Sequence, residues 1–126
     1  MSNSILSVNG NRAMNYVLQT IFEKDYGFIP VMNVYQAASC LRSKKGIKVI
    51  IVDVDFQPQQ SWEFIEHIKS SKLFQTSVIV LTTATTEDIQ QKCYELQIEE
   101  MFFKPFNPVD VITAVKSIMS LTLHTV

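Results

Sequence analysis

The feature that most constrains the fold is a regular alternation of short apolar runs with stretches of helical periodicity. Runs of strand length are followed by helical patterns five times along the chain. In the first helical pattern, apolar residues recur at the i, i+3, i+4 spacing of one helix face: Met14, Val17, Leu18, Ile21 and Phe22. Strands separated by helices favour parallel pairing through helical crossovers. The sequence therefore predicts an α/β fold built on one parallel sheet.

The composition of individual strands predicts their order in this sheet. The run Phe28–Met32 contains Pro30, which lacks a backbone donor and belongs on an edge strand. By contrast, Val49–Val52 and Val78–Leu81 are apolar at every position, as central strands covered on both faces should be. A flavodoxin-like, doubly wound five-stranded sheet of order 2-1-3-4-5 satisfies both observations.

Capping residues predict several helix boundaries. The third helix is expected to run from Ser61 or Trp62 to about Ser70. Thr85 or Thr86 is expected to cap the fourth helix. Asn107 can cap the last helix, with Pro108 in its first turn.

Length and composition exclude several classes of protein. At 126 residues the chain is expected to form a single domain, 1–126. The net charge of -1 gives no electrostatic footprint for nucleic acid. No apolar stretch reaches the roughly 20 residues that span a bilayer, and no signal-peptide pattern opens the chain. Cys40 and Cys93 match no metal or redox spacing and indicate free thiols. We therefore expect a cytoplasmic protein that binds neither nucleic acid nor membrane.

Four chain positions are predicted to meet at one edge of the sheet. Asn9-Gly10, Asp53, Thr82 and Lys104 each follow an apolar run of strand length. In open parallel sheets, ligands bind outside the carboxyl ends of the strands, where the strand order reverses. A carboxylate, a hydroxyl and an ammonium gathered there form a candidate site for a phosphoryl group.

In this arrangement the chain resembles the receiver domains of two-component response regulators, including chemotaxis-type single-domain receivers, from about Ser4 to Ser120. The resemblance rests on Asp53, Thr82 and Lys104-Pro105-Phe106 at the ends of strands three, four and five. It implies that Asp53 accepts a phosphoryl group from a histidine kinase or phosphotransfer protein. Thr82 would then contact the phosphoryl oxygens, and Lys104 would neutralise their charge. Beyond accepting this group, the domain is not expected to be an enzyme.

The resemblance has two further structural implications. The Lys104-Pro105 bond is expected to be cis, because the chain must turn to aim Lys104 at the crevice. The downstream protein is expected to bind the face formed by the fourth helix, the fifth strand and the fifth helix.

Three departures from the family pattern affect the metal or the switch. The acidic pair expected after strand one is replaced by Asn9-Gly10, which leaves Asp53 as the predicted ligand of a weakly bound Mg²⁺. Met101 stands at the position of the switch aromatic, and Ser61 replaces a usual glycine. Phosphorylation is therefore predicted to be impaired. Asp55 is expected to be a solvated loop carboxylate, with approach to a metal as its alternative role.

Other functions remain open at this point. Asp53-Val54-Asp55 resembles the first motif of haloacid-dehalogenase-type phosphatases, although no late acidic motif follows Lys104. A constitutive, protein-binding pseudo-receiver is the alternative inside the receiver family. Trp62 is expected to lie against the loop after strand three, and an exposed Trp62 would indicate a contact surface.

Overall fold

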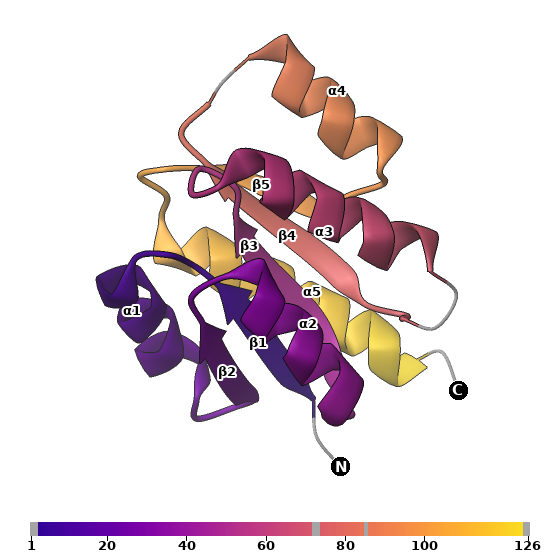
Figure 1. The fold of residues 1–126 in the computed structure, drawn as a ribbon. Coiled ribbons are helices and arrows are strands. Elements are labelled where there is room, and N and C mark those ends of the chain that lie inside the picture. Colours follow the sequence, from indigo (N-terminus) through magenta and orange to yellow (C-terminus); the bar gives the residue numbers. More distant parts are fainter. Residues whose placement is uncertain (1–2, 72–73, 85, 125–126) are drawn as a thin grey trace.

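The computed structural model describes residues 3–71, 74–84 and 86–124, and the side chains up to residue 120. Five strands alternate with five helices along the described chain (Figure 1). The elements are β1 (Ser4–Val8), α1 (Arg12–Phe22), β2 (Gly27–Val31), α2 (Val34–Ser43), β3 (Ile47–Asp53), α3 (Pro58–Ser70), β4 (Ser77–Thr82), α4 (Glu87–Glu95), β5 (Glu100–Phe103) and α5 (Pro108–His124).

The strands form one parallel sheet in the order β2-β1-β3-β4-β5, which confirms the predicted topology. Pro30 lies on β2, opposite Ser7 of β1, and β2 is an edge strand as its proline predicted. This edge strand runs from Gly27 to Val31, one residue earlier than expected.

Helices cover both faces of the sheet and give the domain two apolar layers. Along β3, Ile50 and Val52 point to the layer under α2, α3 and α4, whereas Val49 and Ile51 point to the layer under α1 and α5. All four side chains are fully buried. This double coverage explains why β3 is apolar at every position instead of alternating.

Helix α3 begins at Pro58, three residues before the earlier of its two predicted starts. Gln57 adopts a left-handed backbone with φ of 52°, and Pro58 occupies the first turn. A proline suits this position because its fixed φ is already helical and its missing N–H has no partner there. The polar run after Phe56 therefore starts the helix, where the sequence had suggested a loop.

The buried face of α1 contains a polar residue that apolar periodicity does not reveal. Asn15 is buried with Leu18 and Phe22, whereas Val17 is 45% exposed, contrary to the predicted apolar face. The Asn15 amide donates to the backbone carbonyl of Val31 at 3.1 Å and accepts a hydrogen bond from the Ser7 hydroxyl. Asn15 thus ties α1 to both β1 and β2.

The remaining predictions on termini and thiols are largely confirmed. Thr86 caps α4 and Asn107 accepts from the Val109 N–H at the start of α5. Cys40 and Cys93 are free thiols, the former only partly buried. None of the helices in the described ranges is long and apolar enough to cross a membrane.

Candidate functional site

A crevice of about 550 Å³ lies at the carboxyl ends of β1, β3 and β5. Most of the predicted site positions line it, and its full lining is Asn9, Gly10, Asn11, Arg12, Asp53, Asp55, Phe56 and Lys104. The sheet places it here because β1 and β3 are neighbours and the strand order reverses beside them.

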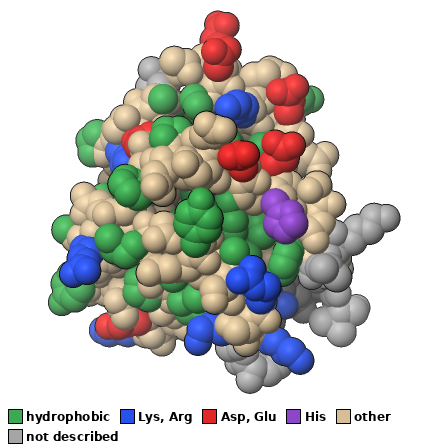
Figure 2. Space-filling model, viewed as in Figure 1, with side chains coloured by type: hydrophobic (Ala, Val, Ile, Leu, Met, Phe, Trp, Pro, Cys, Tyr) green, Lys and Arg blue, Asp and Glu red, His purple; other side chains and the backbone are tan. Residues whose placement is uncertain are grey.

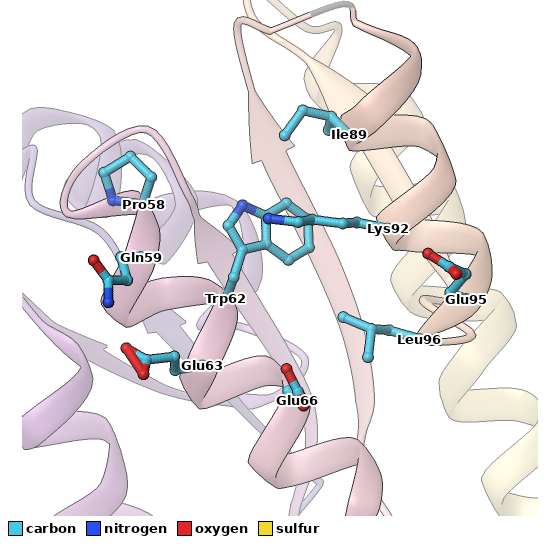
Figure 3. Close-up of a pocket in the computed structure, with 9 residues that line it drawn as sticks. All are labelled: Pro58, Gln59, Trp62, Glu63, Glu66, Ile89, Lys92, Glu95 and Leu96. Atoms are coloured by element: carbon cyan, nitrogen blue, oxygen red, sulfur yellow. The ribbon is translucent and has the colours of Figure 1, made fainter.

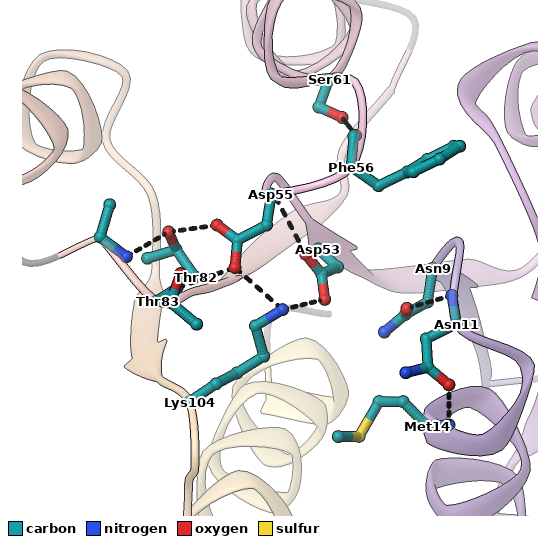
Figure 4. A network of polar contacts seen from close by, with 11 residues as sticks. Asn9, Asn11, Met14, Asp53, Asp55, Phe56, Ser61, Thr82, Thr83 and Lys104 are labelled. Carbon is teal, nitrogen blue, oxygen red and sulfur yellow. Dashed lines mark hydrogen bonds and ion pairs between the residues drawn. The ribbon is translucent and has the colours of Figure 1, made fainter.

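Lys104 joins two carboxylates in this crevice (Figure 4). Its Nζ lies 2.6 Å from Asp53 Oδ2 and 2.9 Å from Asp55 Oδ2. Asp53 is 7% exposed, so its charge has little solvent to stabilise it and the ammonium supplies that stabilisation. The Lys104-Pro105 peptide bond is cis, as predicted.

Asp55 lies exposed in the loop after β3, as expected, but its side chain has partners that the sequence did not predict. Its Oδ1 accepts from the Thr82 hydroxyl at 2.8 Å, and its Oδ2 accepts from the Thr83 N–H at 2.9 Å. Asp53 Oδ1 accepts from the Asp55 N–H at 3.0 Å, which fixes the chain between the two carboxylates. The Asp-x-Asp spacing was the available signal, but it does not tell which way the second carboxylate turns.

The contact between Lys104 and Asp55 shifts the pKa values of these two side chains. Burial alone would raise the pKa of Asp55, but hydrogen bonds from Lys104, Thr82 and Thr83 outweigh it and hold that pKa below the ordinary value. Burial alone would lower the pKa of Lys104, but Asp53 and Asp55 raise it above the ordinary value. Both groups are therefore charged at neutral pH.

Asn9 and Gly10, at the positions of the expected acidic pair, offer the crevice no carboxylate. Asn9 Oδ1 accepts from the Asn11 N–H at 2.8 Å, which fixes the amide orientation because a flipped amide would set donor against donor. Asn9 Nδ2 is buried without a hydrogen-bond partner in the structure. Figure 4 shows this nitrogen on the side of the crevice that holds Asp53. A donor therefore faces the crevice where a cation needs an acceptor.

Gly10 is covered by the ring of Phe56, a residue that the sequence did not single out. A Cβ atom on Gly10 would lie 2.7 Å from Phe56 Cγ, closer than carbon atoms approach without displacement. The ring is itself about half exposed, and the Phe56 carbonyl accepts from the Ser61 hydroxyl at 3.2 Å. A side chain at position 10 is thus excluded unless Phe56 moves.

These residues do not fit the Mg²⁺ site that the resemblance implies. Magnesium takes hard oxygen ligands, usually including one or two carboxylates. Here both nearby carboxylates are bonded to Lys104, and position 9 presents a donor. Within the described part of the chain, no group of three or more His, Cys, Asp or Glu side chains is arranged to hold a metal.

The two predicted switch positions, Thr82 and Met101, lie on the neighbouring strands β4 and β5. Thr82 is 1% exposed at the end of β4, and its oxygen accepts from the Ala84 N–H at 3.0 Å. Met101 is half-buried on β5, with its Sδ 3.5 Å from Cys93 Sγ of α4. Met101 therefore contacts α4 directly.

The Trp62 side chain projects from α3 toward α4 (Figure 3). It is 7% exposed, and the Lys92 Nζ is 5.2 Å from the centre of its ring. A second cavity of about 640 Å³ separates the two helices here and is lined by Trp62, Glu63, Glu66, Lys92 and Glu95 among others. In Figure 2, most of the visible acidic side chains lie in the upper half of the view, and most of the visible basic side chains lie in the lower half.

Comparison with known proteins identifies the fold and the family. The family model described as "Response regulator receiver domain" matches residues 5–116. No curated protein matches the chain. A response regulator from Thermotoga maritima is similar in structure, with 26% identity, a TM-score of 0.82, and coverage of 95% of this chain and 99% of that one.

Two further solved structures share the fold. The chemotaxis response regulator CheY4 of Vibrio cholerae has 19% identity and a TM-score of 0.79, over 94% of this chain and 99% of that one. The signal receiver domain of an HD domain-containing protein from Pseudomonas fluorescens Pf-5 has 18% identity and a TM-score of 0.85, over 95% and 96%. With the family model matching most of its length, the chain belongs to the response regulator receiver domain family.

Proposed function

We propose that this receiver domain works mainly as a protein-binding module whose phosphorylation at Asp53 is impaired. The observation that carries the proposal is the crevice itself: Asn9 and Gly10 supply no carboxylate, and Lys104 already pairs with Asp53. Magnesium binding is accordingly proposed to be weak. The free thiols Cys40 and Cys93 suit a reducing cytoplasm, where we place the protein.

The reaction proposed to be slow is transfer from a phosphohistidine of a kinase or phosphotransfer protein. A carboxylate oxygen of Asp53 would attack the phosphorus, the P–N bond would break, and the new P–O bond would give an acyl phosphate. The freed imidazole takes up a proton. If Asp53 Oδ2 is the attacking oxygen, it gives up part of its contact with Lys104, and negative charge grows in a crevice that already holds the Asp55 carboxylate.

The proposed partner surface is the face of α4, β5 and α5. Each of these elements exposes a large apolar side chain: Tyr94 is 80% exposed, Phe103 is 37% exposed and Val109 is 60% exposed. Exposed aromatic residues are enriched in protein interfaces. Met101 of β5 contacts Cys93 of α4, with 3.5 Å between the two sulfur atoms, and so links two of the three elements of this face.

Labelling with radioactive acetyl phosphate and Mg²⁺ tests the impaired phosphorylation. We expect wild-type protein to label much more slowly than Asn9→Asp/Gly10→Asp, because the variant regains two candidate oxygen ligands. Asp53→Asn, made in both the wild type and the restored variant, is the negative control, because it removes the proposed acceptor and should abolish labelling. Equal labelling of wild type and the restored variant would show that Asp53 is a competent acceptor as it stands.

A further inference from the structure

The carboxylate of Asp55 is held by three donors of different kinds that come from two strand ends. The Thr82 hydroxyl at the end of β4 and the backbone N–H of the next residue, Thr83, lie 2.8 and 2.9 Å from the carboxylate oxygens. The ammonium of Lys104, the residue after β5, lies at 2.9 Å. A hydroxyl on one carboxylate oxygen, and an amide and a cation on the other, form a site for an oxyanion.

The donors are oriented independently of their occupant. The Ala84 N–H donates to the Thr82 oxygen at 3.0 Å, which turns the hydroxyl proton away from Ala84 and toward Asp55. The Lys104 ammonium is placed by its 2.6 Å contact with Asp53. The site is thus built by the ends of β4 and β5, and Asp55 enters it from the loop after β3.

Asp53 lies next to this site. Lys104 Nζ contacts both carboxylates, so a phosphoryl group carried on Asp53 Oδ2 would have its oxygens within reach of the same ammonium. Such a group carries strong acceptor oxygens and about two negative charges, and it competes for the same donors. The Asp55 side chain is 29% exposed, so it can leave toward solvent.

We propose that Asp55 is an internal occupant of an oxyanion site, its carboxylate filling the place that Thr82, Thr83 and Lys104 would otherwise offer to the oxygens of a phosphoryl group on Asp53. The inference rests on the proposed function and deepens it, because it names a second cause of impaired phosphorylation besides the missing acids. It also means that the Thr82 hydroxyl is held in its bonded orientation without any phosphorylation.

Binding of inorganic phosphate, followed by NMR of the Thr83 and Lys104 amide signals, tests the inference. The background is Asp53→Asn, which removes the neighbouring charge and the phosphoryl acceptor but keeps a side-chain oxygen that can accept from Lys104. We expect Asp53→Asn/Asp55→Ala to bind phosphate at least about tenfold more tightly than Asp53→Asn, a difference of about 1.4 kcal/mol. Asp53→Asn/Glu66→Ala, which removes an exposed carboxylate of α3, should behave like Asp53→Asn.

Equal phosphate affinity with and without Asp55, or shifts confined to residues away from Thr83 and Lys104, overturns the inference. If the alanine variant does not fold, Asp55→Ser in the same background gives the same comparison, because it also removes the carboxylate from the site. The outcome is distinguishable from that of the labelling experiment: phosphate binding without Asp53 says nothing of phosphorylation, and slow labelling of wild type does not require Asp55 to fill the site.

Discussion

The ring of Phe56 lies over Gly10 so closely that a Cβ atom at position 10 would be 2.7 Å from its Cγ. The missing acid at this position is therefore accompanied by a residue that occupies the space of a side chain there. Replacing Gly10 by aspartate alone requires the ring to move.

We predict that truncating Phe56 increases the effect of restoring the acids. Asn9→Asp/Gly10→Asp/Phe56→Ala should bind Mg²⁺ about tenfold more tightly than Asn9→Asp/Gly10→Asp, measured by calorimetry, since the new carboxylate no longer competes with the ring. Phe56→Ala by itself should leave Mg²⁺ binding weak, because it adds no ligand. Identical affinities of the triple and double variants would show that the ring moves aside at no cost.

Stability is predicted to depend on pH through Asp55. Its pKa in the folded protein is lowered, so its contribution is present above the ordinary value of 3.8 and is lost as the pH falls through the lower folded value. We expect Asp55→Asn to be less stable than wild type at pH 7 and the two to converge in strong acid. Thermal melts from pH 7 to the most acidic pH at which both proteins still fold measure this. A gap that stays constant over the whole range would assign the loss to shape and not to charge.

At alkaline pH, the stability of the folded protein is predicted to depend on the charge of Lys104. Its pKa is raised above 10.5, so its contribution is complete below that value and is lost as the pH rises through the folded value. Melts from pH 8 upward should show Lys104→Met, which keeps the length of the stem, approaching wild type only above pH 10.5. Lys116→Met, at an exposed position of α5, is the control and should follow wild type throughout.

Replacing Asn15 should destabilise the domain more than replacing a polar residue on the surface of the same helix, because Asn15 is buried and hydrogen-bonded. Asn15→Ala leaves the buried Ser7 hydroxyl without its acceptor and removes one of the two donors to the Val31 carbonyl, which still accepts from the Asn9 N–H at 3.0 Å. We expect a loss of about 1–3 kcal/mol in urea unfolding. Gln19→Ala, at a half-buried position of the same helix, should change stability by less than about 0.5 kcal/mol. A similar small loss for both variants would mean that water replaces the amide.

Trp62 is the single tryptophan of the chain and reports on the contact between α3 and α4. Lys92→Met keeps an aliphatic stem but removes the cation above the ring, so we expect a changed emission spectrum and a stability loss of about 0.5–1 kcal/mol. Lys69→Met, which breaks a surface pair with Glu99, should leave the emission unchanged. Unaltered emission of Lys92→Met would show that the ammonium is mobile in solution.

The sequence alone determined the frame of the molecule because that frame depends on local chemistry and periodicity. Pro30 has no backbone N–H to donate to a neighbouring strand, and continuous apolar runs need cover on both faces. These features predicted the edge strand, the two central strands and the strand order. The strand order in turn brought Asp53, Thr82 and Lys104 to one edge of the sheet, as the structure confirms.

Only the tertiary structure decided what the loop residues do. The direction of the Asp55 carboxylate depends on donors supplied by two other strands, and the position of Phe56 depends on a chain that turns left-handed at Gln57 and starts α3 at Pro58. The sequence did not predict the role of Asn15 for the same reason, because its hydrogen-bond partners lie on β1 and β2. Periodicity describes which face a residue belongs to, whereas a hydrogen bond across the fold requires the three-dimensional meeting of segments that are distant in sequence.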